Sequence, residues 1–127
     1  MKNVLFLSSN ESLFIDGVVK YFKNRTDVSF KLLTDNKNAI SYIKAKKLNI
    51  ESIWLDKDEI KNYLLDKNFD LIIVDGFNLI LDKEVTQKNN VISLHFSCLP
   101  KYRIKNPIKE AFINKDSKTV FTIYRLN

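Results

Sequence analysis

Residues 3–10 read NVLFLSSN, an apolar run that stops at three small polar residues. A strand in the middle of a parallel sheet has this pattern, because helices cover both of its faces and a loop follows it. Residues 70–74 read DLIIV and have the same character. These two segments predict the centre of a parallel sheet and so decide the class of fold.

Strand and helix signals alternate along the rest of the chain. We predict further strands at 28–33, 52–55, 91–95 and 119–126, and helices that begin near Ser12, Asn38, Asp56 and Asn106-Pro107. Strands that alternate with helices in this way predict βαβ units with right-handed crossovers. The fold class is therefore α/β, a doubly wound, Rossmann-like, mostly parallel sheet with helices on both faces.

Several side chains can be placed from local spacing. Residues 56–59, DKDE, fit a capping box at the start of a helix. In the preceding predicted helix, we expect Ile40 and Ile43 to face the core. Trp54 and Cys98 are expected to pack in or near the core.

The composition predicts one domain over residues 1–127, since 127 residues with 45% apolar side chains can form one real core. The single cysteine, the lack of a run of about 20 apolar residues and the lack of a signal peptide predict a cytoplasmic protein with no membrane contact. The net charge of +6 favours an anionic partner, such as a phosphorylated small molecule or RNA. A lysine-rich composition inherited from an AT-rich genome explains this charge equally well.

His95 is the only histidine, and it ends an apolar run just before a loop that contains Pro100. In open α/β domains, ligands collect beyond the carboxyl ends of the strands. A ring that titrates near neutral pH is useful at such an edge. The position of His95 therefore predicts the edge of an active site.

Several separated segments resemble the folate-dependent formyltransferases, namely 4–12, 35–39 with 45–50, 69–81 and 93–102, and the resemblance runs nearly end to end. Residues 99–114 are more similar to the sugar N-formyltransferases than to the purine-pathway branch. The resemblance implies the N-terminal catalytic domain of this family. It also implies transfer of a formyl group from 10-formyltetrahydrofolate, without a metal, to the amine of an amino sugar or nucleotide-linked sugar.

The chemistry explains which residues such a reaction needs. Attack of an amine on the formyl carbon places negative charge on the formyl oxygen, which a positioned donor stabilises. His95 matches the family's histidine and would donate to that oxygen, while Ser93 stands where the family carries an asparagine. The family's aspartate would fall beyond Asn127. Asp75 or Asp82 could substitute for it, or could simply end a strand or cap a helix.

The resemblance also implies binding residues. It assigns the folate to Gly76, Phe77, Asn78, Leu79, Ile80 and Leu81, whose apolar members would line either a pocket or the core. It assigns the acceptor to Asn10, Ser12, Lys101, Tyr102, Arg103 and Lys105, although a solvated loop explains the last cations nearly as well. Glu11 argues against phosphate binding by the first loop, because it stands where glycine is usual in the purine branch and would repel an anion.

Two alternatives to an amino-sugar formyltransferase stay open. A degenerate member that keeps the fold and a ligand pocket would explain Ser93 and the position of Asn127. A relative of methionyl-tRNA formyltransferase would explain the positive charge, but nucleic acid is not the expected partner because no RNA-binding extension follows. An exposed final strand would also allow two copies to pair as a homodimer.

Overall fold

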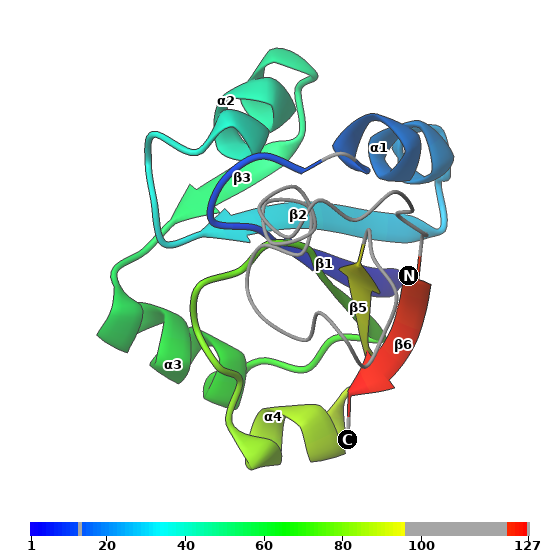
Figure 1. Ribbon diagram of the computed structural model, residues 1–127. Helices are drawn as coiled ribbons and strands as arrows, with labels where there is room; N and C mark the ends of the chain where they lie inside the picture. The colour runs from blue at the N-terminus through cyan, green and yellow to red at the C-terminus, as the bar shows by residue number, and fades with distance from the viewer. Residues whose placement is uncertain (13, 96–121, 127) are drawn as a thin grey trace.

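The computed structural model describes residues 1–12, 14–95 and 122–126 (Figure 1). Its strands and helices occur in the order β1 (Lys2–Leu7), α1 (Ile15–Lys23), β2 (Val28–Thr34), α2 (Ile40–Lys47), β3 (Glu51–Trp54), α3 (Lys57–Asp66), β4 (Leu71–Val74), α4 (Lys83–Lys88), β5 (Val91–His95) and β6 (Thr122–Leu126). The predicted helix at Asn106-Pro107 and positions 119–121 of the last predicted strand lie outside the described residues.

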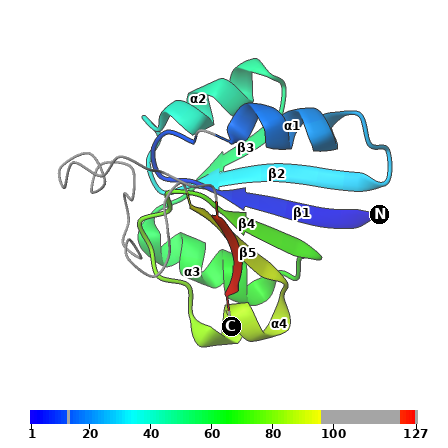
Figure 2. The same cartoon turned by 45° about the vertical axis from the view of Figure 1, so that its right-hand side comes forward.

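The strands form one sheet in the order β3-β2-β1-β4-β5-β6. The pairs β2–β3, β1–β2, β1–β4 and β4–β5 are parallel, and only β6 runs antiparallel to its neighbour β5. Helices α1 and α2 lie on one face of the sheet, and α3 and α4 lie on the other (Figures 1 and 2). The predicted doubly wound α/β class is confirmed.

The central strand β1 feeds both layers, because successive side chains of a strand point to opposite faces. Leu5 and Leu7 pack with the helix α3 residues Ile60 and Leu64. Val4 and Phe6 pack on the other face, in a cluster that includes Ile15 and Val19 of α1 and Ala45 of α2. This two-sided burial explains why residues 4–7 form an uninterrupted apolar run.

The predicted capping box at the start of α3 is confirmed. The Asp56 Oδ1 accepts a hydrogen bond from the Glu59 backbone N at 2.8 Å, and the Glu59 Oε1 accepts one from the Asp56 N at 3.0 Å. Both bonds satisfy backbone donors that a helix start leaves without intrahelical partners.

We expect Asp56→Ala to lower the free energy of unfolding by about 1 kcal/mol, because this substitution removes the cap. Urea denaturation at pH 7 measures the loss. Asp66→Ala is the matched control, since Asp66 is an exposed aspartate in the last turn of the same helix. It should change stability by less than about 0.5 kcal/mol. Equal losses in the two variants would contradict the assigned cap.

The prediction that Ile40 and Ile43 face the core is wrong. Their side chains are 55% and 44% exposed, and α2 instead turns Ser41 and Ala45 toward the sheet. Ser41 can be buried because its hydroxyl oxygen lies 2.9 Å from the Ser8 Oγ and 2.7 Å from the Asn10 carbonyl oxygen. The small Ala45 allows the helix to lie close to β2.

Two further sequence predictions need correction. Trp54 is 48% exposed, because it is the last residue of β3, which is an outermost strand of the sheet. The helix predicted to begin near Ser12 begins at Ile15, and Phe14 occupies its cap position in place of Ser12. The Ser12 hydroxyl instead donates to Asp75 and accepts a hydrogen bond from the Phe14 N at 3.1 Å.

Candidate active site

The carboxyl ends of the parallel strands meet at one edge of the sheet. Leu7 of β1 pairs with Leu33 of β2 and Val74 of β4, and Val74 pairs with Ser93 of β5. The connections that follow these strands therefore emerge side by side. The order of strands reverses direction between β1 and β4, and ligands of open α/β sheets bind at such a switch point.

Three hydrogen bonds join the connection after β1 to the connection after β4. The Ser9 N donates to the Gly76 O at 3.0 Å, and the Asn78 N donates to the Ser9 Oγ at 2.7 Å. The third bond runs from the Ser12 hydroxyl to the Asp75 Oδ2. Ser12, Gly76 and Asn78, which the sequence assigned to binding, are thus brought together at the switch point.

The turn after β4 depends on Gly76. Its φ is 64°, in the left-handed region that glycine adopts at little cost. This turn carries residues 77–81 away from the sheet edge, and Asp75 stays behind at the end of the strand. The glycine turn therefore sets the position of the predicted folate segment.

Asp75 is the buried carboxyl group of this site, with 9% of its surface exposed. Burial raises the pKa of its carboxyl to about 6, against the opposing effect of the hydrogen bond from Ser12. The sequence offered Asp75 only as a substitute for a missing aspartate. An aspartate directly after four apolar strand residues was the signal for a carboxyl held at a sheet edge.

Several backbone groups of the first loop, residues 8–12, form hydrogen bonds to other parts of the protein. The Ser8 N donates to the Leu33 O, the Asn10 O accepts from the Ser41 N at 3.1 Å, and the Ser9 O accepts from the Asn36 Nδ2 at 3.2 Å. A phosphate-binding loop needs free amide groups that point at the anion. Glu11 is exposed on this loop, and the expectation that its charge repels a phosphate there stays a prediction. The Asn10 side chain itself is exposed.

The predicted folate segment lines a cavity of about 400 Å³ between α3 and the start of α4. Phe77 is buried in the core cluster, while Leu79 and Leu81 pack against that cluster from the side. Ile80 is 96% exposed at the cavity rim. Both predicted placements therefore occur: Phe77 serves the core, and its neighbours form a pocket wall.

Strand β5 carries the two residues assigned to catalysis. Ser93 is buried, and its backbone lies between Val74 of β4 and Tyr124 of β6. His95 is the last residue of β5, with its backbone opposite Thr122. Lys101, Tyr102, Arg103 and Lys105 lie outside the described residues, as does Cys98.

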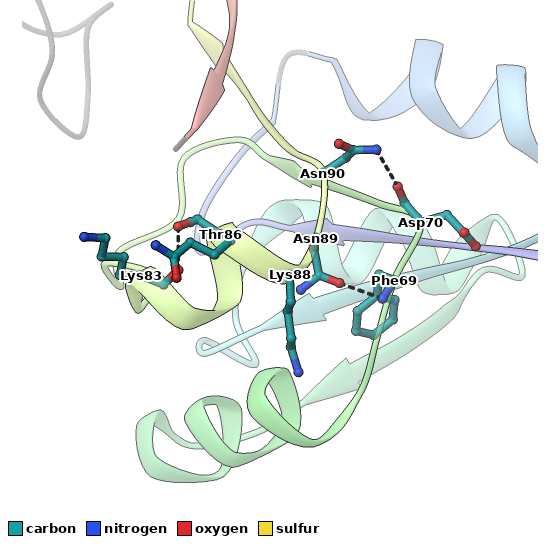
Figure 3. Close-up of a pocket in the computed structure, with 8 residues that line it drawn as sticks. Phe69, Asp70, Lys83, Thr86, Lys88, Asn89 and Asn90 are labelled. Carbon is teal, nitrogen blue, oxygen red and sulfur yellow. Dashed lines mark hydrogen bonds between the residues drawn. The ribbon is translucent and has the colours of Figure 1, made fainter.

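A second cavity, of about 590 Å³, lies at the opposite edge of the sheet, where β4 and β5 begin (Figure 3). Its polar groups tie the end of α4 to α3 and to the segment that precedes β4. The Asn89 Oδ1 accepts from the Phe69 N at 2.8 Å, the Asn89 Nδ2 donates to the Val85 O at 2.9 Å, and the Lys88 Nζ donates to the Leu65 O. We therefore assign this cavity to the structural junction between α4 and β4.

Over residues 1–12, 14–95 and 122–126, no group of three or more His, Cys, Asp or Glu side chains is arranged to hold a metal ion. Within the same ranges, none of the helices combines the length and the apolar character that crossing a bilayer requires.

The comparison with known proteins identifies the class. The formyl transferase family model matches residues 3–127, and the chain belongs to this family. A segment of 64 residues is 42% identical to the methionyl-tRNA formyltransferase of Campylobacter jejuni subsp. doylei. That segment covers 50% of this chain and only 21% of the relative.

Solved structures of formyltransferases share the fold. The phosphoribosylglycinamide formyltransferase of Campylobacter jejuni superposes with a TM-score of 0.78 at 21% identity, covering 99% of this chain and 74% of that one. A sugar N-formyltransferase from a Shewanella species gives a TM-score of 0.66 at 23% identity, covering 100% of this chain and 52% of that one. The resemblance read from the sequence is confirmed at the level of the family and its fold.

Proposed function

We propose that this chain transfers a formyl group from 10-formyltetrahydrofolate to the amine of a nucleotide-linked amino sugar. Family membership supports formyl transfer. The observation that carries the proposal is the pairing of Val74 with Ser93, which sets the segment 76–81 and the end of β5 at one edge of the sheet. Donor-binding and oxyanion-stabilising residues would then lie on neighbouring strands.

The described residues fit the formyl donor. A cavity of about 400 Å³ is within the range of small-molecule pockets, which combine apolar walls with a few polar groups. Leu79 and Leu81 offer apolar surface to the faces of a pterin ring, and the main chain of this segment offers hydrogen-bonding groups to its edge. The donor supplies an activated formyl carbon, and this segment would hold and orient it.

His95 and Ser93 are proposed to stabilise negative charge on the formyl oxygen. A donor positioned at a developing oxyanion contributes roughly 10²–10³-fold in rate. The Ser93 hydroxyl can donate only one hydrogen bond and reaches less far than an amide. We therefore assign the larger share of this effect to His95.

Asp75 is the better of the two substitutes for the family's aspartate. Asp82 lies at the N-cap position of α4 and faces Lys61, with its Oδ2 3.9 Å from the Lys61 Nζ. Asp75 ends β4 at the switch point, and its pKa of about 6 suits a group that accepts a proton from an attacking amine. The proposed site thus has a proton acceptor within the described residues.

The direct test is transfer of an isotope-labelled formyl group. The purified chain is mixed with labelled 10-formyltetrahydrofolate and a panel of nucleotide-linked amino sugars, and the formylated product is detected by mass. Transfer to one of these amines above the rate without protein is the expected result. No transfer to any of them would favour the non-catalytic alternative.

The second candidate acceptor is methionyl-tRNA. The 42% identity to a methionyl-tRNA formyltransferase over half of this chain and the net charge of +6 favour it. RNA binding driven by phosphate contacts weakens steeply with salt, because counterions are released. A salt-dependent shift of tRNA in a gel, together with formylation of methionyl-tRNA, would replace the amino sugar as the acceptor.

Replacing Ser93 by asparagine restores the residue type of the family. We expect the rate of formyl transfer to rise or to stay unchanged, because an amide can donate a second hydrogen bond. Single-turnover kinetics measures the change. Because Ser93 is buried, urea denaturation of the same variant must accompany the assay. A sharp drop in rate at unchanged stability would show that the serine has a task of its own.

A further inference from the structure

Trp54 stands out among the large apolar side chains at the carboxyl edge of the sheet. It ends the edge strand β3, and its side chain is 48% exposed. The Lys37 Nζ lies 5.5 Å from the centroid of the indole ring. The ammonium lies over the ring in a cation–π contact, and the part of the indole that stays exposed is a surface on which a planar heterocyclic base can stack.

Asp35 provides a second, independent observation next to this ring. Its Oδ1 is buried and finds no hydrogen-bond donor among the described residues, the only side-chain atom of that part of the chain in this condition. The residue as a whole is partly exposed, although this oxygen itself is covered. A covered carboxylate oxygen without a donor is costly, and a donor from a ligand would remove this cost.

The backbone brings the ring and the carboxylate together. Thr34 of β2 pairs with Trp54 of β3, and the Leu55 N donates to the Thr34 O at 3.2 Å. Asp35 is the residue that follows Thr34, so it leaves the sheet beside Trp54. The connection from β2 to α2, which carries Asp35 and Lys37, runs along this corner (Figure 1).

This connection is held in one conformation by its own hydrogen bonds. The Asn36 N donates to the Thr34 Oγ1 at 3.1 Å, the Asn38 N donates to the Asn36 Oδ1 at 3.1 Å, and the Ala39 N donates to the Asn36 O at 2.9 Å. The Asn36 Nδ2 also donates to the Ser9 O at 3.2 Å. A surface ordered before binding loses less entropy when a ligand arrives.

We propose that Trp54, Asp35 and Lys37 form a binding site for a ribonucleotide. The base stacks on the Trp54 indole, and the ribose hydroxyls donate to the Asp35 carboxylate. An acidic residue at the end of the second strand binds ribose in this way in dinucleotide-binding sheets. The Lys37 ammonium offsets the charge of the phosphate.

This site specifies where the nucleotide part of the proposed acceptor binds. The choice of a nucleotide-linked acceptor rests on the proposed function. The ends of β2 and β5 are three strand spacings apart, or about 14 Å. A nucleotide held at Asp35 could therefore extend its sugar along the sheet edge toward His95. The site would anchor the part of the acceptor that does not react.

Trp54 is the only tryptophan of the chain, so its fluorescence reports on this site alone. We expect AMP and UMP, as a purine and a pyrimidine probe, to quench this emission in a saturable way. Their 2′-deoxy forms should bind several-fold more weakly, because they offer Asp35 one hydroxyl fewer. Absence of saturable quenching by both nucleotides at millimolar concentration would overturn the proposal.

Variants separate the three contacts, with binding measured by equilibrium dialysis of labelled nucleotide. Trp54→Ala should weaken binding roughly 5- to 150-fold, which is the range for loss of one stacked base. Asp35→Asn should remove the preference for the ribonucleotide over its deoxy form, and Lys37→Ala should weaken AMP more than adenosine. Glu51→Gln, which removes an exposed carboxylate at the other end of β3, is the matched control and should bind normally.

Undiminished binding by the Trp54 and Asp35 variants would place the nucleotide elsewhere and overturn the assignment. The assay needs no formyl donor, so its result is independent of turnover. Nucleotide binding without formyl transfer would retain this site and reject the proposed function. Formyl transfer without nucleotide binding at Trp54 would do the reverse.

Discussion

Replacing Asp75 by asparagine is expected to raise the free energy of unfolding more at pH 7 than at pH 4. The pKa of this carboxyl is about 6 in the folded state and 3.8 as its ordinary value. The folded state therefore holds its proton more tightly than the unfolded state does. Ionisation of Asp75 costs stability as the pH rises from about 4 to about 6.

The size of this effect follows from the shift. A shift of about two pKa units corresponds to about 3 kcal/mol between the two protonation states. An asparagine has a similar shape and can still accept a hydrogen bond from Ser12, but it cannot ionise. The advantage of Asp75→Asn over the unmodified chain should thus grow by on the order of 2–3 kcal/mol between pH 4 and pH 7.

Urea denaturation at several pH values measures this advantage. Asp66→Asn removes one exposed carboxylate from α3 and controls for the change in net charge. Its effect on stability should stay nearly constant over the same range. If the stability offset of the Asp75 variant were the same at pH 4 and pH 7, the pKa of the Asp75 carboxyl would not be raised as described above.

Replacing His95 by asparagine is expected to lower the rate of formyl transfer by about 100-fold or more. An asparagine amide can still donate, but it is shorter than the imidazole and does not titrate near neutral pH, so we expect the loss typical of a misplaced oxyanion donor. The Michaelis constant for the acceptor should change much less, because the interaction is made mainly in the transition state. Steady-state kinetics with labelled donor measures both quantities.

The control for His95 must separate chemistry from folding. Asn89→Ala is expected to cost about 1–3 kcal/mol of stability at the opposite edge of the sheet, where it removes hydrogen bonds to the Phe69 N and the Val85 O, and it should leave the rate of transfer unchanged. Circular dichroism and urea denaturation should show that the His95 variant remains folded. Full activity in His95→Asn would remove this ring from the proposed mechanism.

The sequence predicted the fold wherever one local signal was decisive. The apolar runs of β1 and β4 and the capping box of α3 lie close to the predicted positions. Side-chain burial in α2 was predicted wrongly, because the partners of Ser41 come from residues 8 and 10, more than 30 positions away. Spacing within a helix cannot reveal such partners. The exposure of Trp54 likewise depends on which strand ends the sheet.

The candidate site was predictable in its parts but not in its connections. The sequence placed Ser12, Gly76 and Asn78 among the binding residues by resemblance. The sequence could not show that the Ser12 hydroxyl donates a hydrogen bond to Asp75, since these residues are 63 positions apart. The raised pKa of Asp75 has the same origin, because burial is set by the packing of distant elements. The catalytic and binding roles assigned to these residues remain predictions.

Ser9 hydrogen-bonds to the connections that follow the strands on either side of β1. Its N donates to the Gly76 O and its Oγ accepts from the Asn78 N, both in the connection after β4. Its O accepts from the Asn36 Nδ2 in the connection after β2, so this fully buried residue is hydrogen-bonded to both connections. We expect a ligand that shifts one connection to act on the other through these bonds. Thermodynamic linkage makes any such coupling reciprocal, so each of two substrates bound at this edge would change the affinity for the other by the same factor.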